Sequence, residues 1–253
     1  MSNALITGAS SGIGFSTARR LAQRGHQVLL LSYDEPELLQ ACADLGAQAI
    51  PVLCDLAVPE QVDGLWQRLE ETYGPIHILI NNAGVGHHGE LADTDMATMR
   101  RLFEVNFFAA ANLCGQAMRA MTSRGRGHIL NLTSASARRS LALIGAYGAS
   151  KAALHGLTQT LRLEAAGTGV AVGEVLPISV TTPFFARAGY RPRGLTQTPE
   201  KVAEQILLCL DKGEAERTTH WPTAFGFVLD ALFPNLVARL LSSRYRAERR
   251  ART

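Results

Sequence analysis

The sequence predicts an α/β fold in which a doubly wound parallel sheet carries helices on both faces. Short apolar runs typical of buried strands recur along the chain, and segments with helical spacing of apolar residues separate them. Such alternation of strands and helices is typical of a parallel sheet that is covered on both faces. At 253 residues the chain has the length of one such domain, or at most two small ones.

Each expected element follows from its local pattern. The expected strands are the apolar runs 4–6, 28–31, 49–53, 76–80, 128–132 and 170–176. Helical spacing predicts helices near 12–24, 35–44, 59–73, 95–122, 147–166 and 199–211. Residues 184–198 show neither pattern and follow a strand end. Because long loops are often lids or disordered, and ligands bind at strand ends, we expect this stretch beside a ligand site.

A glycine-rich turn, Thr7-Gly8-Ala9-Ser10-Ser11-Gly12-Ile13-Gly14, joins the first expected strand to the first expected helix. Such a turn forms a phosphate cradle, because glycines let the backbone approach a pyrophosphate and the free N–H groups of the helix start face the anion. The spacing is Gly-x3-Gly-x-Gly rather than the common Gly-x-Gly-x2-Gly. The turn alone also fits a strand–helix connection without a ligand, so the other motifs must decide.

Composition narrows the class of protein. The four cysteines are scattered without metal-ligand spacing, so we expect a reduced, cytoplasmic chain with no metal site. The first expected strand begins by residue 3 or 4, which leaves no room for a signal peptide, and no apolar run reaches the ~18 residues that span a bilayer. Residues 239–253 contain six arginines and one glutamate, a charge of +5, whereas the whole chain has a net charge of +3. The rest of the chain therefore carries about −2 and has no basic surface, so we expect no nucleic acid partner.

Tyr147 and Lys151 stand four residues apart and therefore share one face of the expected helix 147–166. A phenol titrates near ~10, which is too high for a base at neutral pH, and a nearby ammonium lowers that pKa. Tyr147 can then give a proton to a carbonyl oxygen or take one from an alcohol. By itself, such a pair is usually a surface pair, so this interpretation depends on the rest of the chain.

Four motifs strengthen that interpretation, because they follow the order and spacing of one family. They are the turn 7–14, Asn81-Asn82-Ala83-Gly84, Asn131-Leu132-Thr133-Ser134 and Tyr147-Gly148-Ala149-Ser150-Lys151. From residue 3 to about 220, the chain resembles the classical short-chain dehydrogenase/reductase family. The resemblance implies a single Rossmann-like domain over residues 1–220, followed by a C-terminal apolar helix and arginine-rich tail over 221–253. It also implies an NAD(P)-dependent oxidoreductase that transfers hydride between a nicotinamide and a carbonyl or alcohol.

Two other classes of function stay open. A dinucleotide-sensing binding protein on the same fold would not need the complete catalytic set. An extended-type epimerase or dehydratase shares the Tyr-x3-Lys pair, but such chains are longer and have a different glycine spacing.

The resemblance implies four catalytic residues. Tyr147 is the general acid or base, and Ser134, thirteen residues before it, would hydrogen-bond the substrate oxygen. Lys151 would also bind the nicotinamide ribose, and Asn106 would hold a water that links Lys151 to solvent. Two of them have a simpler alternative, since Ser134 could satisfy a local backbone group and Asn106 could be a buried asparagine with a purely structural role.

The cofactor residues implied by the resemblance lie along the sheet edge. They are Gly8, Ser10, Ser11, Gly12, Ile13, Gly14, Ser32, Tyr33, Asp55, Leu56, Asn82, Ala83, Gly84, Tyr147, Lys151, Pro177, Ile178 and Thr182. Asp55 would contact the adenine, although it could instead cap the helix near Pro59. Thr182 would contact the nicotinamide amide. Ile178 stands where the family usually has a glycine, so we expect an altered fit at the nicotinamide.

The choice between NAD(H) and NADP(H) stays open, with a slight preference for NADP(H). An acidic residue at position 32 would bind a ribose 2′-hydroxyl and reject a 2′-phosphate, but the residue is Ser32. An arginine at position 33 would favour the phosphate, but the residue is Tyr33, and Ser11 is not basic either. The missing carboxylate at position 32 favours NADP(H), and Asp34 weakens this preference.

The substrate side is expected to accept a lipophilic alcohol or ketone. The apolar and aromatic residues that suggest this are Leu141, Leu143, Ile144, Phe184, Phe185 and Tyr190. Arg138 and Arg139 could meet an acid, but adjacent loop arginines are more often solvated. His87 and His88 could line the substrate side or be solvated, and they lack a metal-ligand spacing.

Two further expectations concern partners. Helices 95–122 and 147–166 are rich in small and apolar residues and pair between subunits in the resembling family, which implies a homodimer or homotetramer. The C-terminal segment has a stripe of Leu232, Leu236 and Leu240 before its arginines. It either packs on its own domain or a subunit, or forms an amphipathic anchor that makes weak contact with an anionic membrane surface.

Overall fold

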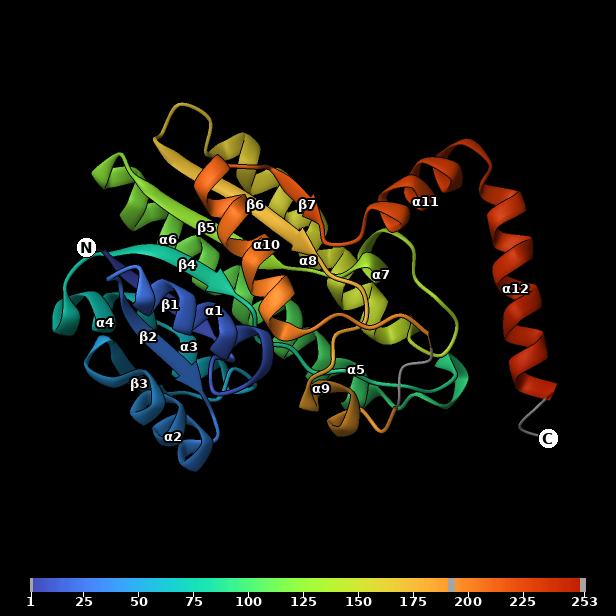
Figure 1. Cartoon of the computed structure of the whole chain (residues 1–253), viewed down its shortest axis with the longest axis horizontal. Helices are drawn as coiled ribbons and strands as arrows, with labels where there is room; N and C mark the ends of the chain where they lie inside the picture. The colour runs from blue at the N-terminus through green and yellow to red at the C-terminus, as the bar shows by residue number, and fades with distance from the viewer. Residues whose placement is uncertain (1, 191–193, 251–253) are drawn as a thin grey trace.

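Seven parallel strands form one sheet in the order β3-β2-β1-β4-β5-β6-β7 (Figure 1). The computed structural model describes residues 2–190 and 194–250. The strands are β1 Asn3–Thr7, β2 Gln27–Ser32, β3 Ala49–Leu53, β4 Ile76–Asn81, β5 Gly127–Leu132, β6 Val170–Leu176 and β7 Glu216–Thr218. Strand order reverses between β1 and β4, and such a switch point opens a crevice at the carboxyl ends of the strands.

Helices connect the strands and cover both faces of the sheet. They are α1 Gly12–Gln23, α2 Glu35–Leu45, α3 Pro59–Val62, α4 Leu65–Tyr73, α5 Met96–Phe103, α6 Ala109–Arg124, α7 Ala135–Arg138, α8 Gly145–Glu164, α9 Pro183–Arg187, α10 Pro199–Lys212, α11 Trp221–Leu232 and α12 Pro234–Arg250. Helices α1, α2 and α10 contribute to the core on one face, and α4, α6 and α8 to the core on the other. The predicted doubly wound α/β fold is confirmed.

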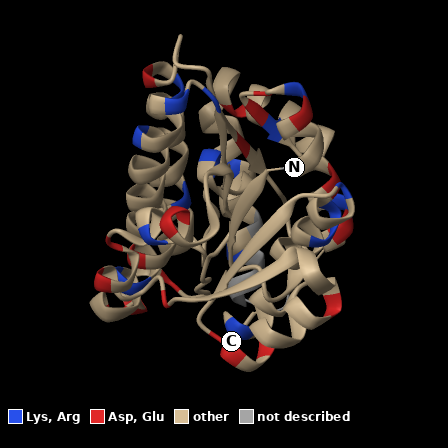
Figure 2. Ribbon diagram, turned by 90° about the vertical axis from the view of Figure 1, so that its left-hand side faces the viewer, with Lys and Arg blue, Asp and Glu red and all other residues tan. Residues whose placement is uncertain are grey.

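The apolar strand runs are explained by burial on both faces. Successive side chains of a strand point to opposite faces. In β1, Leu5 joins the core beneath α4, α6 and α8, whereas Ala4 and Ile6 join the core beneath α1, α2 and α10. Figure 2 accordingly shows acidic and basic residues mixed over the outer helices, with little charge on the strands.

Four regions of the structure differ from the prediction. Strand β7 was not predicted, because Glu216–Thr218 is short and polar, and among the described strands it pairs with β6 alone. The expected helix 59–73 is interrupted at Gly64, whose φ of +67° favours glycine. The expected helix 95–122 contains a π-helical turn over Glu104–Phe108. The stretch 184–198 is not wholly irregular, since α9 reaches Arg187; its residues 191–193 lie outside the described residues.

The C-terminal segment forms two helices rather than one. Helices α11 and α12 are bent by 118° at a short break, and Figure 1 shows α12 standing away from the sheet. In the described part of the chain no single helix is long and apolar enough to cross a bilayer, whereas this bent pair passes that test together. Residues 251–253 lie outside the described residues, and the predicted boundary at residue 220 stays a prediction.

Candidate active site

A cavity of about 970 Å³ runs along the carboxyl ends of the strands. Its wall includes the glycine turn after β1, the ends of β2, β4, β5 and β6, and the start of α8. Every residue expected to contact the cofactor lines this cavity except Gly14. The structure therefore brings together, on one surface, residues that lie up to 174 positions apart, from Gly8 to Thr182.

The glycine turn has the shape of a phosphate cradle. Gly8 and Gly12 have φ of +63° and +57°, which L side chains rarely adopt. A Cβ on Gly14 would lie 2.3 Å from Gly8 O and 2.5 Å from Asn82 Nδ2, so no side chain fits there. No side chain of the described residues caps the start of α1, which leaves its N–H groups available to an anion. The turn therefore fits the pyrophosphate of a dinucleotide.

Asn82 supports this turn. Its Nδ2 donates to Thr7 O at 2.8 Å and to Gly8 O at 2.9 Å, and its backbone N–H donates to Thr7 Oγ1 at 3.0 Å. Both hydrogen bonds donated by the Asn82 side chain therefore go to the protein backbone, although Asn82 also lines the cavity. Asp55 lines the cavity, but it does not cap the helix near Pro59, because α3 begins after Val58 without a side-chain cap; its Oδ1 instead accepts from Ala57 N at 2.9 Å in the turn before that helix.

Ser134, Tyr147 and Lys151 line the same part of the cavity. Ser134 follows β5 and accepts hydrogen bonds from Ser136 N and Ser136 Oγ, so it both caps α7 and faces the cavity. Tyr147 and Lys151 lie on the first turns of α8, one helical turn apart. Lys151 is buried, and its Nζ donates to Leu132 O at 2.9 Å.

Burial dominates the electrostatics of this pair. It raises the pKa of Tyr147 to about 12, although a hydrogen bond with Ser134 opposes the rise. Burial also lowers the pKa of Lys151 to about 8. The expected lowering of the Tyr147 pKa is wrong for this structure, because burial of the phenol raises the pKa and only the hydrogen bond with Ser134 opposes it.

Asn106 lies behind the cavity rather than on its wall. It is 1% exposed and sits in the π-helical turn between α5 and α6. Its Oδ1 accepts from Val85 N at 2.8 Å, and its Nδ2 donates to Val85 O and to Ser150 Oγ at 2.9 Å each. These bonds give it the structural role considered from the sequence, and its link to a water stays a prediction.

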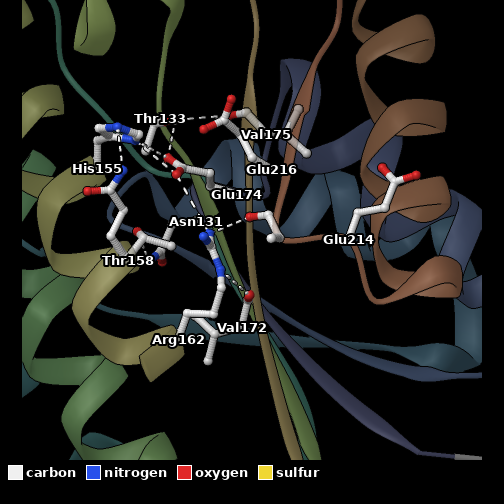
Figure 3. A network of polar contacts seen from close by, with 12 residues as sticks. Asn131, Thr133, His155, Thr158, Arg162, Val172, Glu174, Val175, Glu214 and Glu216 are labelled. Atoms are coloured by element: carbon white, nitrogen blue, oxygen red, sulfur yellow. Dashed lines mark hydrogen bonds and ion pairs between the residues drawn. The ribbon is translucent and has the colours of Figure 1, made fainter. Parts of the chain in front are cut away.

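A row of polar side chains fixes α8 on the sheet (Figure 3). His155 Nδ1 lies 2.9 Å from Glu174 Oε1, and Asn131 Nδ2 donates to Thr158 Oγ1 at 2.8 Å. Glu174 is fully buried on β6 and also accepts from Thr133 Oγ1 at 3.0 Å. Burial raises the pKa of Glu174, whereas its hydrogen bonds with His155 and Thr133 oppose the rise. This network was not predicted, because nothing local shows that Glu174 and His155 meet.

The same network contains three possible metal ligands. Atoms of His155, Glu174 and Glu216 lie within 4.8 Å of one another. Each of them already has a protein partner, since Glu216 pairs with Arg138 and Glu174 pairs with His155. We therefore assign no metal to this group.

The substrate side is largely apolar. Leu141, Ile144, Phe184 and Phe185 line the cavity, whereas Leu143 and Tyr190 do not. Phe184 packs edge-on against Tyr147, with ring centroids 5.6 Å apart. Neither His87 nor His88 lines the cavity; His88 stacks on Tyr190 at 4.3 Å, and His87 Nε2 lies 3.1 Å from Thr94 Oγ1. The contact between His88 and Tyr190 joins the loop after α9 to the loop after β4, and Phe184 joins α9 to α8.

The two loop arginines are paired rather than solvated. Arg138 pairs with Glu216 and lies over the ring of Phe227, and Arg139 pairs with Asp230 at 3.2 Å. Both interactions reach from the loop after β5 to the region around α11. The expectation of solvated arginines missed them because it considered the loop alone.

The sequence also missed one whole wall of the cavity. That wall comes from α5, α11 and α12, through Thr98, Arg101, Thr223, Gly226, Phe227, Asp230, Val237 and Leu241. The helical spacing of the α11 residues does show that they share one face. No local signal shows that this face meets the cavity.

Comparison with known proteins agrees with this geometry. A family model described as short chain dehydrogenase matches residues 2–191. The chain belongs to the short-chain dehydrogenase family. Ketoacyl reductase HetN of Nostoc sp. is 36% identical over 219 residues, which cover 84% of this chain and 76% of the relative.

Solved structures give the same result. A short-chain dehydrogenase from Sphingobium yanoikuyae in complex with NADPH matches with a TM-score of 0.83 and 30% identity, over 94% of this chain and 96% of that one. One from Burkholderia phymatum in complex with NAD matches with a TM-score of 0.85 and 27% identity, over 93% and 94%. The predicted family is thereby confirmed, and this short-chain dehydrogenase is an NAD(P)-dependent oxidoreductase.

The glycine cradle leads to a first prediction. Gly14→Ala places a Cβ against Gly8 O and Asn82 Nδ2, so the turn must shift and dinucleotide affinity should fall at least roughly tenfold, about 1.4 kcal/mol. Fluorescence titration with reduced dinucleotide measures this, and circular dichroism should show a retained fold. Gly156→Ala on α8 is the matched control, because a Cβ there meets nothing within 4 Å. Unchanged affinity in Gly14→Ala would mean that the cradle is elsewhere.

Proposed function

We propose that this short-chain dehydrogenase reduces the carbonyl group of a lipophilic small molecule, with Tyr147 as proton donor. One observation carries the proposal: Ser134, Tyr147 and Lys151 face the same cavity as the glycine turn. When bound, the nicotinamide supplies the hydride. A dinucleotide-sensing role without catalysis is not favoured, because it leaves this arrangement without a use.

Each residue has a separate task in the proposed reaction. Ser134 Oγ donates a hydrogen bond to the carbonyl oxygen and holds it beside Tyr147. The Tyr147 phenol gives its proton to the carbonyl oxygen as the C=O double bond becomes a single bond, and the hydride that a bound nicotinamide would supply completes the reduction at the carbon. Lys151 would hold the ribose of the cofactor and stabilise the phenolate that remains. A proton from solvent then restores the phenol.

The protonation state of the site supports the direction of reduction. At neutral pH the Tyr147 phenol is neutral, because its pKa is about 12, and it is therefore ready to donate a proton. The Lys151 ammonium is mostly charged below its pKa of about 8. Oxidation of the alcohol would instead require the phenolate, so that direction should become faster as the pH rises.

The cavity wall supports a lipophilic substrate. Beyond Tyr147 it is formed mainly by Leu141, Ile144, Phe184, Phe227 and Val237. Of the charged groups that line this region, Arg139 and Asp230 pair with each other, and Arg101 of α5 also lines the cavity. The wall is otherwise apolar, which suits a carbonyl on an apolar body.

We also infer a preference for NADP(H) over NAD(H). Ser10 Oγ lies 3.1 Å from Ser32 Oγ and donates to Glu37 Oε2 at 2.7 Å, which places Glu37 beside the end of β2. Arg187 of α9 pairs with the same carboxylate at 3.3 Å and lines the cavity. Arg187 thus supplies the cation that Tyr33 does not. The Glu37 carboxylate opposes a 2′-phosphate, and the preference requires Arg187 to exchange Glu37 for the phosphate, which is the stronger partner for a guanidinium.

We further propose a homodimer or homotetramer in the cytoplasm, with a peripheral membrane contact through the C-terminal segment. Two exposed apolar side chains support the assembly. Phe108, just before α6, is 52% exposed, and Leu163, near the end of α8, is 78% exposed. A partner subunit on these helices would remove both from water.

Tyr147→Phe should keep dinucleotide affinity and lower turnover by roughly 100-fold or more, since the ring stays and the proton donor is lost. Turnover is measured with a panel of lipophilic ketones, from the loss of absorbance of the reduced cofactor over time. Tyr73→Phe changes a tyrosine outside the cavity and should leave both quantities unchanged. Near-native turnover of Tyr147→Phe on any accepted ketone would exclude Tyr147 as the acid.

Arg187→Ala should weaken NADPH binding on the order of tenfold and leave NADH binding nearly unchanged, because only the 2′-phosphate needs the cation. Glu37→Gln should strengthen NADPH binding, since it removes a competing carboxylate. Calorimetric titration of both dinucleotides measures these constants. Arg24→Ala, which breaks a similar exposed pair with Asp211, is the control. Equal losses for NADPH and NADH in Arg187→Ala would show that Arg187 does not read the phosphate.

Light scattering should give the mass of a dimer or tetramer at micromolar concentration. Leu163→Asp places a charge on the proposed subunit face and should shift the protein towards the monomer. Leu195→Asp, at another exposed leucine, should not. A monomeric wild-type protein would contradict the proposed assembly.

A further inference from the structure

Helix α11 has two different faces. Thr223, Phe227 and Asp230 line the cavity and lie at helical spacing. The opposite stripe is apolar and faces water. It consists of Trp221, Phe225, Val228 and Leu232, and each of these side chains is more than half exposed. Helix α11 is thus the wall of the proposed substrate cavity on one side and an uncovered apolar surface on the other.

Helix α12 repeats this division. Val237 and Leu241 line the cavity, whereas Leu236 and Leu240 are exposed. Tyr245 Oη donates to Glu90 Oε1 at 2.8 Å and ties the far end of the helix to the loop after β4. The exposed side chains of α11 and α12, together with Leu229 and Phe233 at the bend, are called the outer face below.

Charged residues are absent from the outer face of α11 and gather towards the end of α12. The one charged residue of α11, Asp230, turns inward to Arg139, so the outer face of α11 carries no charge. Helix α12 has exposed Arg239 and Arg246, and residues 239–253 contain six arginines against one glutamate. Trp221, at the start of α11, is 79% exposed, and tryptophan is favoured where lipid meets water. An apolar face with an interfacial tryptophan and a cationic end is typical of a helix that lies in a lipid surface.

The charge favours lipid over a second copy of the chain. Two copies joined through the outer face would bring together two segments that each hold six arginines and one glutamate. An anionic phospholipid surface attracts the same arginines instead. The bent pair is also long and apolar enough, by length and composition, to enter a lipid layer.

We propose that the outer face docks on an anionic phospholipid surface and that a lipid-borne carbonyl substrate passes from that surface into the cavity beside α11 and α12. The route follows from the two-sided wall, because one helix thickness separates the docked face from the cavity. This proposal rests on the proposed reduction of a lipophilic carbonyl for its second part only. Docking itself is independent of the reaction.

Docking is tested by co-sedimentation of the full-length protein with vesicles. Wild-type protein should pellet with vesicles of phosphatidylcholine and phosphatidylglycerol, and much less with phosphatidylcholine alone. Phe225→Ser/Leu232→Ser removes two outer-face side chains and should lower the bound fraction at least roughly tenfold. Leu39→Ser/Leu53→Ser removes two leucines elsewhere that are also more than half exposed, and it should bind like the wild type. Pelleting that is equal for both variants, or absent for the wild type, overturns the docking.

Light scattering of the same variants identifies the other occupant. If Phe225→Ser/Leu232→Ser lowers the mass of the assembly and the wild type does not pellet, the outer face is a subunit interface and the lipid proposal is wrong. An unchanged mass together with lost pelleting supports the lipid surface. Circular dichroism and thermal unfolding should show that both variants fold.

The substrate route is tested with a long-chain ketone held in the anionic vesicles and a short, water-soluble ketone. Phe225→Ser/Leu232→Ser should lose activity on the vesicle-held ketone and keep it on the soluble one. Equal loss on both ketones overturns the route. Failure of the wild type to reduce either ketone, with pelleting intact, overturns the proposed reduction while the docking stands.

Discussion

The polar row on α8 is the interaction on which the site depends. Lys151, His155 and Thr158 lie on one face of the helix and bond to Leu132 O, Glu174 and Asn131 of the sheet. Apolar packing alone tolerates small shifts of a helix, whereas buried polar groups must find their partners. Removing His155 would leave the buried Glu174 carboxylate with Thr133 as its nearest remaining partner, and the loss of a partner from a buried charge is costly. The row therefore sets the rotation and register of α8, and Tyr147 lies one turn before it on the same face.

The cofactor end of the site rests on a different constraint, close approach of backbone. The turn after β1 can hold its shape only because Gly14 leaves room for Gly8 O and for the amide of Asn82. Asn82 comes from the end of β4, across the switch point of the sheet. The anion cradle is thus shared by two strands that are neighbours in space, and the polar row on α8 fixes the catalytic end relative to the same sheet edge.

The C-terminal helices add a third constraint, because they complete the cavity at the cost of exposed apolar surface. A soluble chain rarely keeps a continuous apolar face in water without a use for it. Here the same helices supply Phe227 and Val237 to the cavity and Trp221 and Leu236 to the outside. The arginine pairs of the loop after β5 hold α11 in place, since Arg139 reaches Asp230 and Arg138 lies over Phe227.

The sequence by itself determined the α/β fold, six of the seven strands and the motif residues, because strand runs, helical spacing and glycine turns are local patterns. The order and spacing of the four motifs grouped Ser134, Tyr147 and Lys151 into one site, and all three line one cavity in the structure. It could not show Glu174 meeting His155, Arg187 reaching Glu37, or α11 and α12 closing the cavity. These contacts join residues distant in the chain. Burial of Tyr147 itself raises its pKa, which is opposite to the direction expected from the sequence. Only the tertiary structure decided them, because desolvation and long-range pairing depend on what packs against a residue, and no local pattern records its neighbours.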